Sequence, residues 1–67
     1  MWKVVVVICA FGYECQIMEQ KPMEYYQDYN ECMAVSLEKE KLLTETYKNY
    51  DYYVVESAAT CEKVSAS

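Results

Sequence analysis

The 67-residue chain has no histidine and no arginine, and it contains only one glycine and one proline. Without histidine, the Ser-His and Cys-His pairs that activate nucleophiles are excluded. With one glycine, a glycine-rich phosphate-binding loop is excluded as well. Eleven acidic residues provide many chance pairs of carboxylates but no motif around any pair. We therefore expect a protein that is not an enzyme and that needs no cofactor.

Positive charge is also scarce, because six scattered lysines stand against eleven acidic residues and the net charge is −5. Binding to nucleic acid requires clustered basic side chains that neutralise phosphates, and an anionic membrane surface requires the same. No apolar run approaches the ~20 residues of a membrane-spanning helix. We therefore expect neither nucleic acid nor membrane as a partner. A basic partner, or mimicry of an acidic ligand, fits this charge.

The strongest feature that is present is the apolar run at residues 2–11, WKVVVVICAF, which is rich in β-branched side chains. Such side chains favour strands, and a run that is apolar at nearly every position predicts a central strand covered on both faces. Lys3 and the apolar residues after it also resemble the start of a secretory signal. The only small-residue cleavage site, around Ala10 and Gly12, is poor, so the strand is favoured.

The remaining elements follow from the periodicity of the apolar residues and from the positions of turn-forming and helix-capping residues. Gly12 suits a hairpin turn, and residues 15–20 alternate as a short returning strand. Residues 23–29 form a polar-aromatic connection, after which residues 31–49 show a helical pattern that Asp28 or Asn30 can cap. Residues 52–64 form the last strand.

These elements predict an α+β fold, a ββαβ unit whose three-stranded antiparallel sheet has the order 2-1-3, with the helix packed on one face. We expect a single domain over residues 1–64 and a disordered tail at residues 65–67. Because one helix covers one face, alternate residues of the central strand stay exposed on the other. We expect a homodimer through this open sheet face; the alternatives are a different protein partner or the folded-back segment 23–29.

Four cysteines are present, and a small domain gains much from a covalent link. The predicted topology places Cys32 and Cys61 at one end of the sheet, and Cys9 and Cys15 at the other. It therefore predicts the disulfides Cys32–Cys61 and Cys9–Cys15 among three pairings. The alternatives are four reduced, buried thiols, or a zinc or redox site. Zinc and redox sites favour close C-x-x-C pairs, which the sequence lacks.

Seven of the eight tyrosines fall in two acidic stretches, residues 25–29 and 47–53. Tyrosine is rigid, amphipathic and enriched at interface hot spots. The candidate partner-binding residues are Tyr25, Tyr26, Tyr29, Tyr50, Tyr52 and Tyr53. The alternative is that these rings complete a small core while their hydroxyl groups reach water. The two clusters lie at opposite ends of the predicted helix, so they need not form one patch.

The chain resembles the small four-cysteine proteins encoded by marine tailed phages. The resemblance covers most of the chain and rests on a β-branched strand ending in Cys9, on Cys15 six residues later, on Tyr29 to Cys32 opening a helix, and on Cys61 in the final strand. It implies an accessory phage protein, acting on a host component, and assigns no functional residues. A virion or envelope location permits disulfides, whereas a bacterial cytoplasm disfavours them.

Three functional hypotheses result. The first is a small interaction protein that binds a protein partner through an acidic tyrosine-rich surface or through the open sheet face. The second is a disulfide-stabilised structural protein of a virion or envelope. The third is a cysteine-based metal or redox site.

Overall fold

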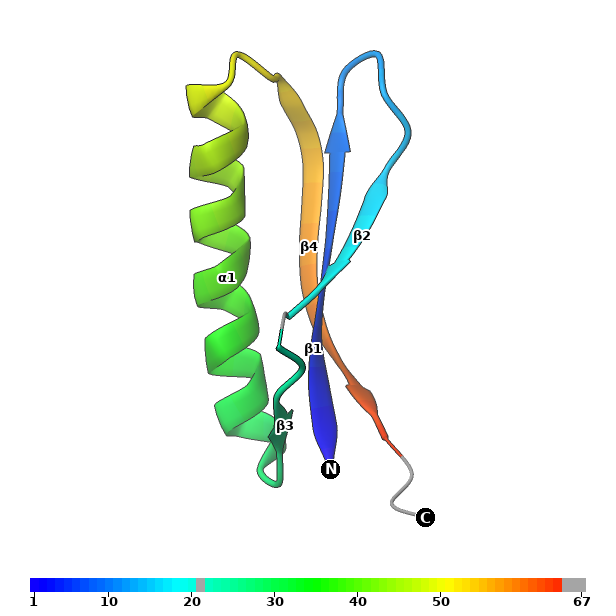
Figure 1. The fold of residues 1–67 in the computed structure, drawn as a ribbon, viewed down its shortest axis with the longest axis vertical. Coiled ribbons are helices and arrows are strands. Elements are labelled where there is room, and N and C mark those ends of the chain that lie inside the picture. The colour runs from blue at the N-terminus through cyan, green and yellow to red at the C-terminus, as the bar shows by residue number, and fades with distance from the viewer. Residues whose placement is uncertain (21, 65–67) are drawn as a thin grey trace.

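The computed structural model describes residues 1–20 and 22–64, so the predicted tail at residues 65–67 lies outside the described residues. Its elements, in chain order, are β1 (Trp2–Ala10), β2 (Gln16–Glu19), β3 (Tyr25–Tyr26), α1 (Tyr29–Asn49) and β4 (Val54–Lys63). The predicted fold class is confirmed, since an antiparallel sheet carries one helix on one face (Figure 1).

The apolar run forms β1, which is the central strand of the sheet. It pairs antiparallel with β4 along its whole length on one side and with β2 on the other. The sheet has a fourth strand that the sequence did not predict. Residues 23–29 were expected to be a connection, but β3 pairs antiparallel with the first residues of β1, along the same edge as β2. Two residues are too few to show an alternating pattern in the sequence. The strand forms only because the chain returns along β1 and pairs with its first residues.

The boundaries of α1 and β4 differ from the predicted ones for identifiable reasons. The helix begins at Tyr29 because the Asp28 carboxylate accepts a hydrogen bond from the Asn30 backbone N–H at 3.0 Å, which makes Asp28 the cap. The last strand begins at Val54 rather than at residue 52. The Tyr52 N–H instead donates to the Tyr47 carbonyl oxygen at 2.9 Å and continues the turn that ends the helix.

The core lies between α1 and the face of β1 that carries Val4, Val6 and Ile8, together with Cys32 and Cys61. The helix packs over β4 and β1 and does not reach β2. Of the two alternating sets of β1 side chains, the even-numbered set therefore faces the helix. The one buried polar side chain of α1, Ser36, satisfies its hydroxyl by donating to the Met33 carbonyl oxygen at 2.8 Å.

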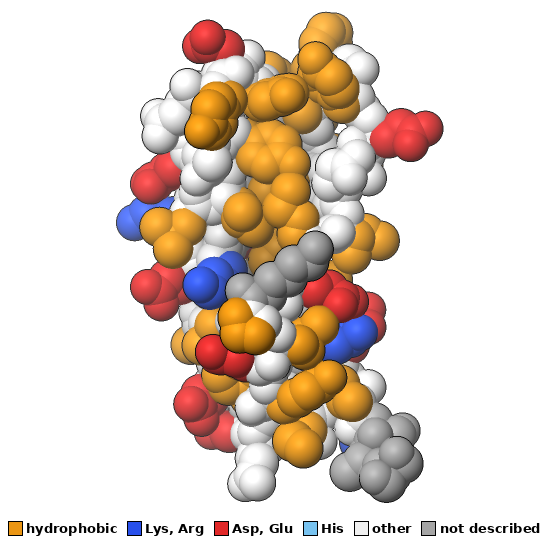
Figure 2. All heavy atoms as spheres, in the orientation of Figure 1, with side chains coloured by type: hydrophobic (Ala, Val, Ile, Leu, Met, Phe, Trp, Pro, Cys, Tyr) orange, Lys and Arg blue, Asp and Glu red, His pale blue; other side chains and the backbone are white. Residues whose placement is uncertain are grey.

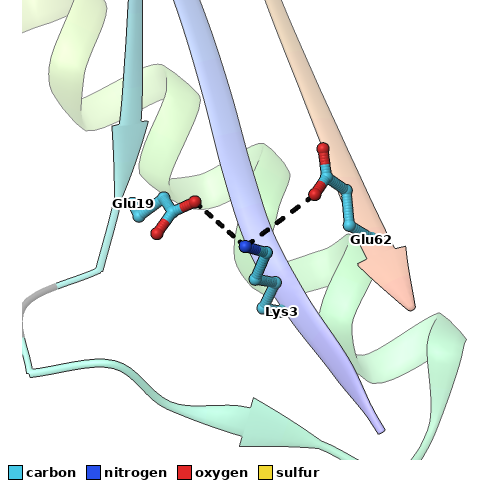
Figure 3. A network of polar contacts seen from close by, with 3 residues as sticks. All are labelled: Lys3, Glu19 and Glu62. Carbon is cyan, nitrogen blue, oxygen red and sulfur yellow. Dashed lines mark hydrogen bonds and ion pairs between the residues drawn. The ribbon is translucent and has the colours of Figure 1, made fainter. Parts of the chain in front are cut away.

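The opposite face of the sheet is partly polar. Lys3, near the start of the central strand β1, pairs with Glu19 of β2 at 3.1 Å and with Glu62 of β4 at 3.8 Å, so its ammonium links three strands (Figure 3). The hydrogen bond and the charge of Glu19 raise the pKa of Lys3 above its ordinary value. Val5, whose cross-strand neighbours are Glu19 and Thr60, is only 4% exposed. Because β3 extends the sheet edge, it does not cover this face.

Candidate functional site

Both predicted disulfides are present. Cys32 and Cys61 are joined with an S–S distance of 2.13 Å, and Cys9 and Cys15 with 2.11 Å. The first bridge is buried in the core and ties the first turn of α1 to β4. The second closes the β1–β2 hairpin, where Cys15 is exposed.

The zinc hypothesis requires the four cysteines to be free thiolates. Zinc is bound by the thiolate form of cysteine. All four cysteines are paired in this structure. The four cysteines cannot form two disulfides and a four-thiolate zinc site at the same time, and the structure contains the two disulfides.

The first tyrosine cluster, formed by Tyr25, Tyr26 and Tyr29, lies where β1 and α1 begin. Tyr29 packs edge-on against Trp2 with ring centroids 4.7 Å apart. The Tyr26 ring packs against the core, and its hydroxyl donates to Glu24 at 3.0 Å and accepts from Gln20 at 3.2 Å. Tyr26 therefore helps to close one end of the core, which was the alternative role for the tyrosines, whereas Tyr25 and Tyr29 are 50% and 44% exposed.

Three tyrosines of the second cluster, Tyr50, Tyr52 and Tyr53, lie at the other end, where α1 ends and leads into β4, and Phe11 and Tyr13 of the hairpin lie beside them. Four of the five side chains are 66–74% exposed, and Tyr52 is 40% exposed. The Tyr52 ring lies 5.3 Å from the rings of both Tyr13 and Tyr47. We call this surface the aromatic end and define it by Phe11, Tyr13, Tyr50, Tyr52 and Tyr53.

One backbone hydrogen bond joins the two loops of the aromatic end, and a second closes the hairpin turn. The Phe11 N–H donates to the Tyr53 carbonyl oxygen at 2.7 Å, and the Tyr13 N–H donates to the Ala10 carbonyl oxygen at 3.1 Å. Gly12 provides the turn with a φ of 84°. The Cys9–Cys15 bridge lies directly beneath this turn. The exposed rings therefore stand on a cross-linked and hydrogen-bonded support.

A groove runs from the aromatic end along the line between α1 and β2, because the helix does not cover β2. Its part nearest the aromatic end has a volume of about 320 Å³ and is lined by Ile8, Met18, Tyr47 and Tyr52, among others. The adjoining part has a volume of about 520 Å³ and is lined by residues that include Leu42 and Leu43. Figure 2 shows hydrophobic side chains gathered at this end of the molecule and continuing as a stripe into the groove.

The sequence predicted Tyr50, Tyr52 and Tyr53 but missed Phe11 and Tyr13, which lie about 40 residues earlier. The predicted topology brings the end of the first strand near the start of the last, but only the register of β1 and β4 in the structure sets Ala10 opposite Val54 and Phe11 beside Tyr53. The molecule measures 40 × 19 × 19 Å. The two tyrosine clusters occupy opposite ends of its long axis, as Figure 1 shows, and do not form one patch.

No protein-family model, curated protein or solved structure matches the chain. Over the residues that the structure describes, no helix is both long enough and apolar enough to cross a membrane.

Proposed function

We propose that this protein is a small, non-enzymatic binding protein that acts through its aromatic end, and that its partner is a protein presenting lysine or arginine side chains. The observation that carries the proposal is the gathering of five exposed aromatic side chains from two distant segments on one cross-linked support. Exposed apolar patches of this kind are uncommon on proteins that have no partner.

The energetics of the aromatic end favour binding. Aromatic side chains have few rotatable bonds, so they lose little conformational entropy when a partner covers them. The bridge and the Phe11–Tyr53 hydrogen bond hold the backbone beneath them before any partner arrives. Such preorganisation raises affinity because less order has to be created on binding.

Charge defines the chemistry of the partner. The chain carries a net charge of −5, and Glu14 and Asp51 lie within the two loops that carry the aromatic rings. Tyrosine rings also attract lysine and arginine through cation–π contacts. A basic protein surface satisfies both features, and the resemblance to accessory phage proteins suggests a host protein as its source.

A second candidate function is structural, on a virion or an envelope. The two disulfides favour it, because such bridges persist in oxidising surroundings. In that role the aromatic end would attach the protein to its assembly.

The binding proposal is tested by NMR titration with 12-residue peptides rich in arginine, in lysine or in glutamate. We expect the basic peptides alone to shift the amide signals of residues 11–14 and 50–53, with a response that weakens as salt is added. The double variant Phe11→Ser/Tyr53→Ser removes two exposed rings and should abolish the shifts. The matched control, Tyr25→Ser/Tyr29→Ser, alters the other tyrosine cluster and should retain them. Equal shifts with the acidic peptide, or shifts centred elsewhere, would contradict the proposal.

A further inference from the structure

Among the strands that the structure describes, β4 has the longest edge without a strand beside it. All of β4, ten residues, follows β1 on one side. On its other side, no strand within the described residues pairs with it. Edge strands are usually short or carry proline or inward-pointing charges that prevent association. The centre of β4 instead consists of Ser57, Ala58, Ala59 and Thr60, whose small side chains leave its backbone accessible.

The backbone groups that point to this edge can be identified. The Val64 N–H donates to the Met1 carbonyl oxygen at 2.8 Å. Hydrogen-bonded pairs alternate along an antiparallel ladder, so residues 56, 58, 60 and 62 direct their N–H and C=O groups to β1. The intervening residues Ser57, Ala59, Cys61 and Lys63 direct theirs to the free edge.

The helix carries an exposed apolar side chain on the same side. The Ser57 hydroxyl donates to the Glu40 carboxylate at 2.6 Å, which shows that the Glu40 side of α1 lies over β4. Leu37 and Thr44 precede and follow Glu40 by three and four residues, so they share that side of the helix. Leu37 is 55% exposed. An open strand edge and an exposed leucine therefore lie next to each other.

We propose that a second copy of this chain pairs antiparallel with the free edge of β4, about a two-fold axis at Thr60, and that the two sheets become one. The axis sets Thr60 beside its own copy, a favourable cross-strand pair. It sets Ser57 opposite Lys63 of the second copy. The two α1 helices, each lying over β4 and β1, come ~10 Å apart, the spacing of packed helices, with Leu37 in the gap.

The charged side chains along β4 and α1 favour a second copy of the chain as the partner, and they favour this register over the neighbouring one. Lys63 of the second copy comes to lie beside Ser57, where the Glu40 carboxylate is already held, and the symmetry creates this ion pair twice. Moving the axis by one residue, to Ala59, shifts the register by two residues and would set Glu56 opposite Glu62 of the other copy, and like charges directly opposite one another are destabilising.

Face-to-face packing of two copies through the other side of the sheet is disfavoured. That face carries Lys3, Glu19, Glu56 and Glu62 around Val7 and Ile17. Burying these charges against a second copy would remove their hydration without providing enough partners of opposite sign. The edge-to-edge dimer leaves them in water. It also places the two aromatic ends at opposite ends of the assembly, which makes the dimer bivalent.

The test is sedimentation velocity over a range of concentrations, with a charge exchange. Lys63→Glu and Glu40→Lys should each weaken the dimer at least about tenfold, because each sets like charges together. The double variant Glu40→Lys/Lys63→Glu restores opposite charges and should restore the dimer. Ile17→Lys, on the uncovered face, is the matched control and should leave the dimer intact. Circular dichroism confirms that each variant is folded.

Three results would overturn the proposal. The first is a monomer at every concentration, which would leave the edge to a different partner. The second is a dimer that Ile17→Lys dissociates while the charge variants do not, which would assign the interface to the sheet face. The third is a dimer lost in the single variants and not regained in the double variant. None of these results bears on peptide binding at the aromatic end, so the two proposals fail separately.

Discussion

The two disulfides divide the molecule into regions with different tasks. The Cys32–Cys61 bridge is buried among Val4, Val6 and Ile8 and joins residues 29 positions apart. The Cys9–Cys15 bridge spans six positions and lies beneath a turn, with Cys15 exposed. The first holds a helix to a sheet and so maintains the fold. The second stiffens a hairpin whose two strands are already close in sequence. Its effect is to hold the backbone beneath the exposed aromatic side chains.

Removing the core bridge should destabilise the protein more than any other change considered. The double variant Cys32→Ala/Cys61→Ala should lower the free energy of unfolding by about 3–4 kcal/mol through chain entropy alone. Truncation inside the core adds to this loss. Guanidinium denaturation followed by circular dichroism measures the effect. A loss under ~1 kcal/mol would show that the bridge does not maintain the fold.

Removing the hairpin bridge should have a smaller effect. Cys9→Ala/Cys15→Ala opens a short loop, for which the same relation gives about 2 kcal/mol, and Cys15 contributes no core packing. The same denaturation experiment compares the two variants directly. In native protein, a thiol reductant should also open this bridge first, because Cys15 is the accessible cysteine. A larger loss here than in the core variant would reverse the comparison.

The turn above the hairpin bridge gives a sharper test of local effects. Gly12 has a φ of 84°, and a Cβ atom added there would meet nothing within 4 Å. Gly12→Ala should therefore cost about 1 kcal/mol of stability, from backbone conformation alone. Thermal unfolding measures this cost. An unchanged free energy of unfolding would show that the turn relaxes readily, which would argue against a rigid support for the aromatic end.

The smallest expected effect concerns Lys3, which lies in neither disulfide region. Its pKa is raised in the folded protein, mainly by the hydrogen bond to Glu19. The resulting stabilisation is fully present below the unfolded-state pKa of about 10.5 and is lost as the pH rises through the higher folded-state pKa. The stability difference between wild type and Lys3→Met should therefore shrink between pH 9 and pH 12. Thermal unfolding across this range checks the trend, and a difference that grows with pH would contradict it.

Much of the fold could be predicted from local patterns. The β-branched run, the single glycine after it and the helical periodicity of residues 31–49 each have a local physical cause, so they indicated β1, the hairpin and α1. Both bridges followed from the topology that these elements imply. The strand β3 could not be predicted, because Tyr25 and Tyr26 have no pattern of their own and pair only where β1 offers a free edge.

The candidate site was predicted only in part. Tyr50, Tyr52 and Tyr53 stood out because they are close in sequence. Phe11 and Tyr13 did not, since their role depends on the antiparallel register of β1 and β4. The expected tyrosine surface at Tyr25, Tyr26 and Tyr29 includes a ring that packs against the core, because Trp2 and the start of β1 need covering at that end.

By itself, the sequence determined that a buried strand, a hairpin, a long capped helix and a final strand exist, because each depends on interactions between near neighbours. It could not determine which face of β1 the helix covers. Val4, Val5, Val6 and Val7 are alike, so no alternation distinguishes the two faces. Only the tertiary structure decided this, when the Cys32–Cys61 bridge and the packing of α1 over β4 brought the even-numbered side chains into the core. The same docking left β2 and the outer edge of β4 uncovered, and it gathered five distant aromatic side chains at one end.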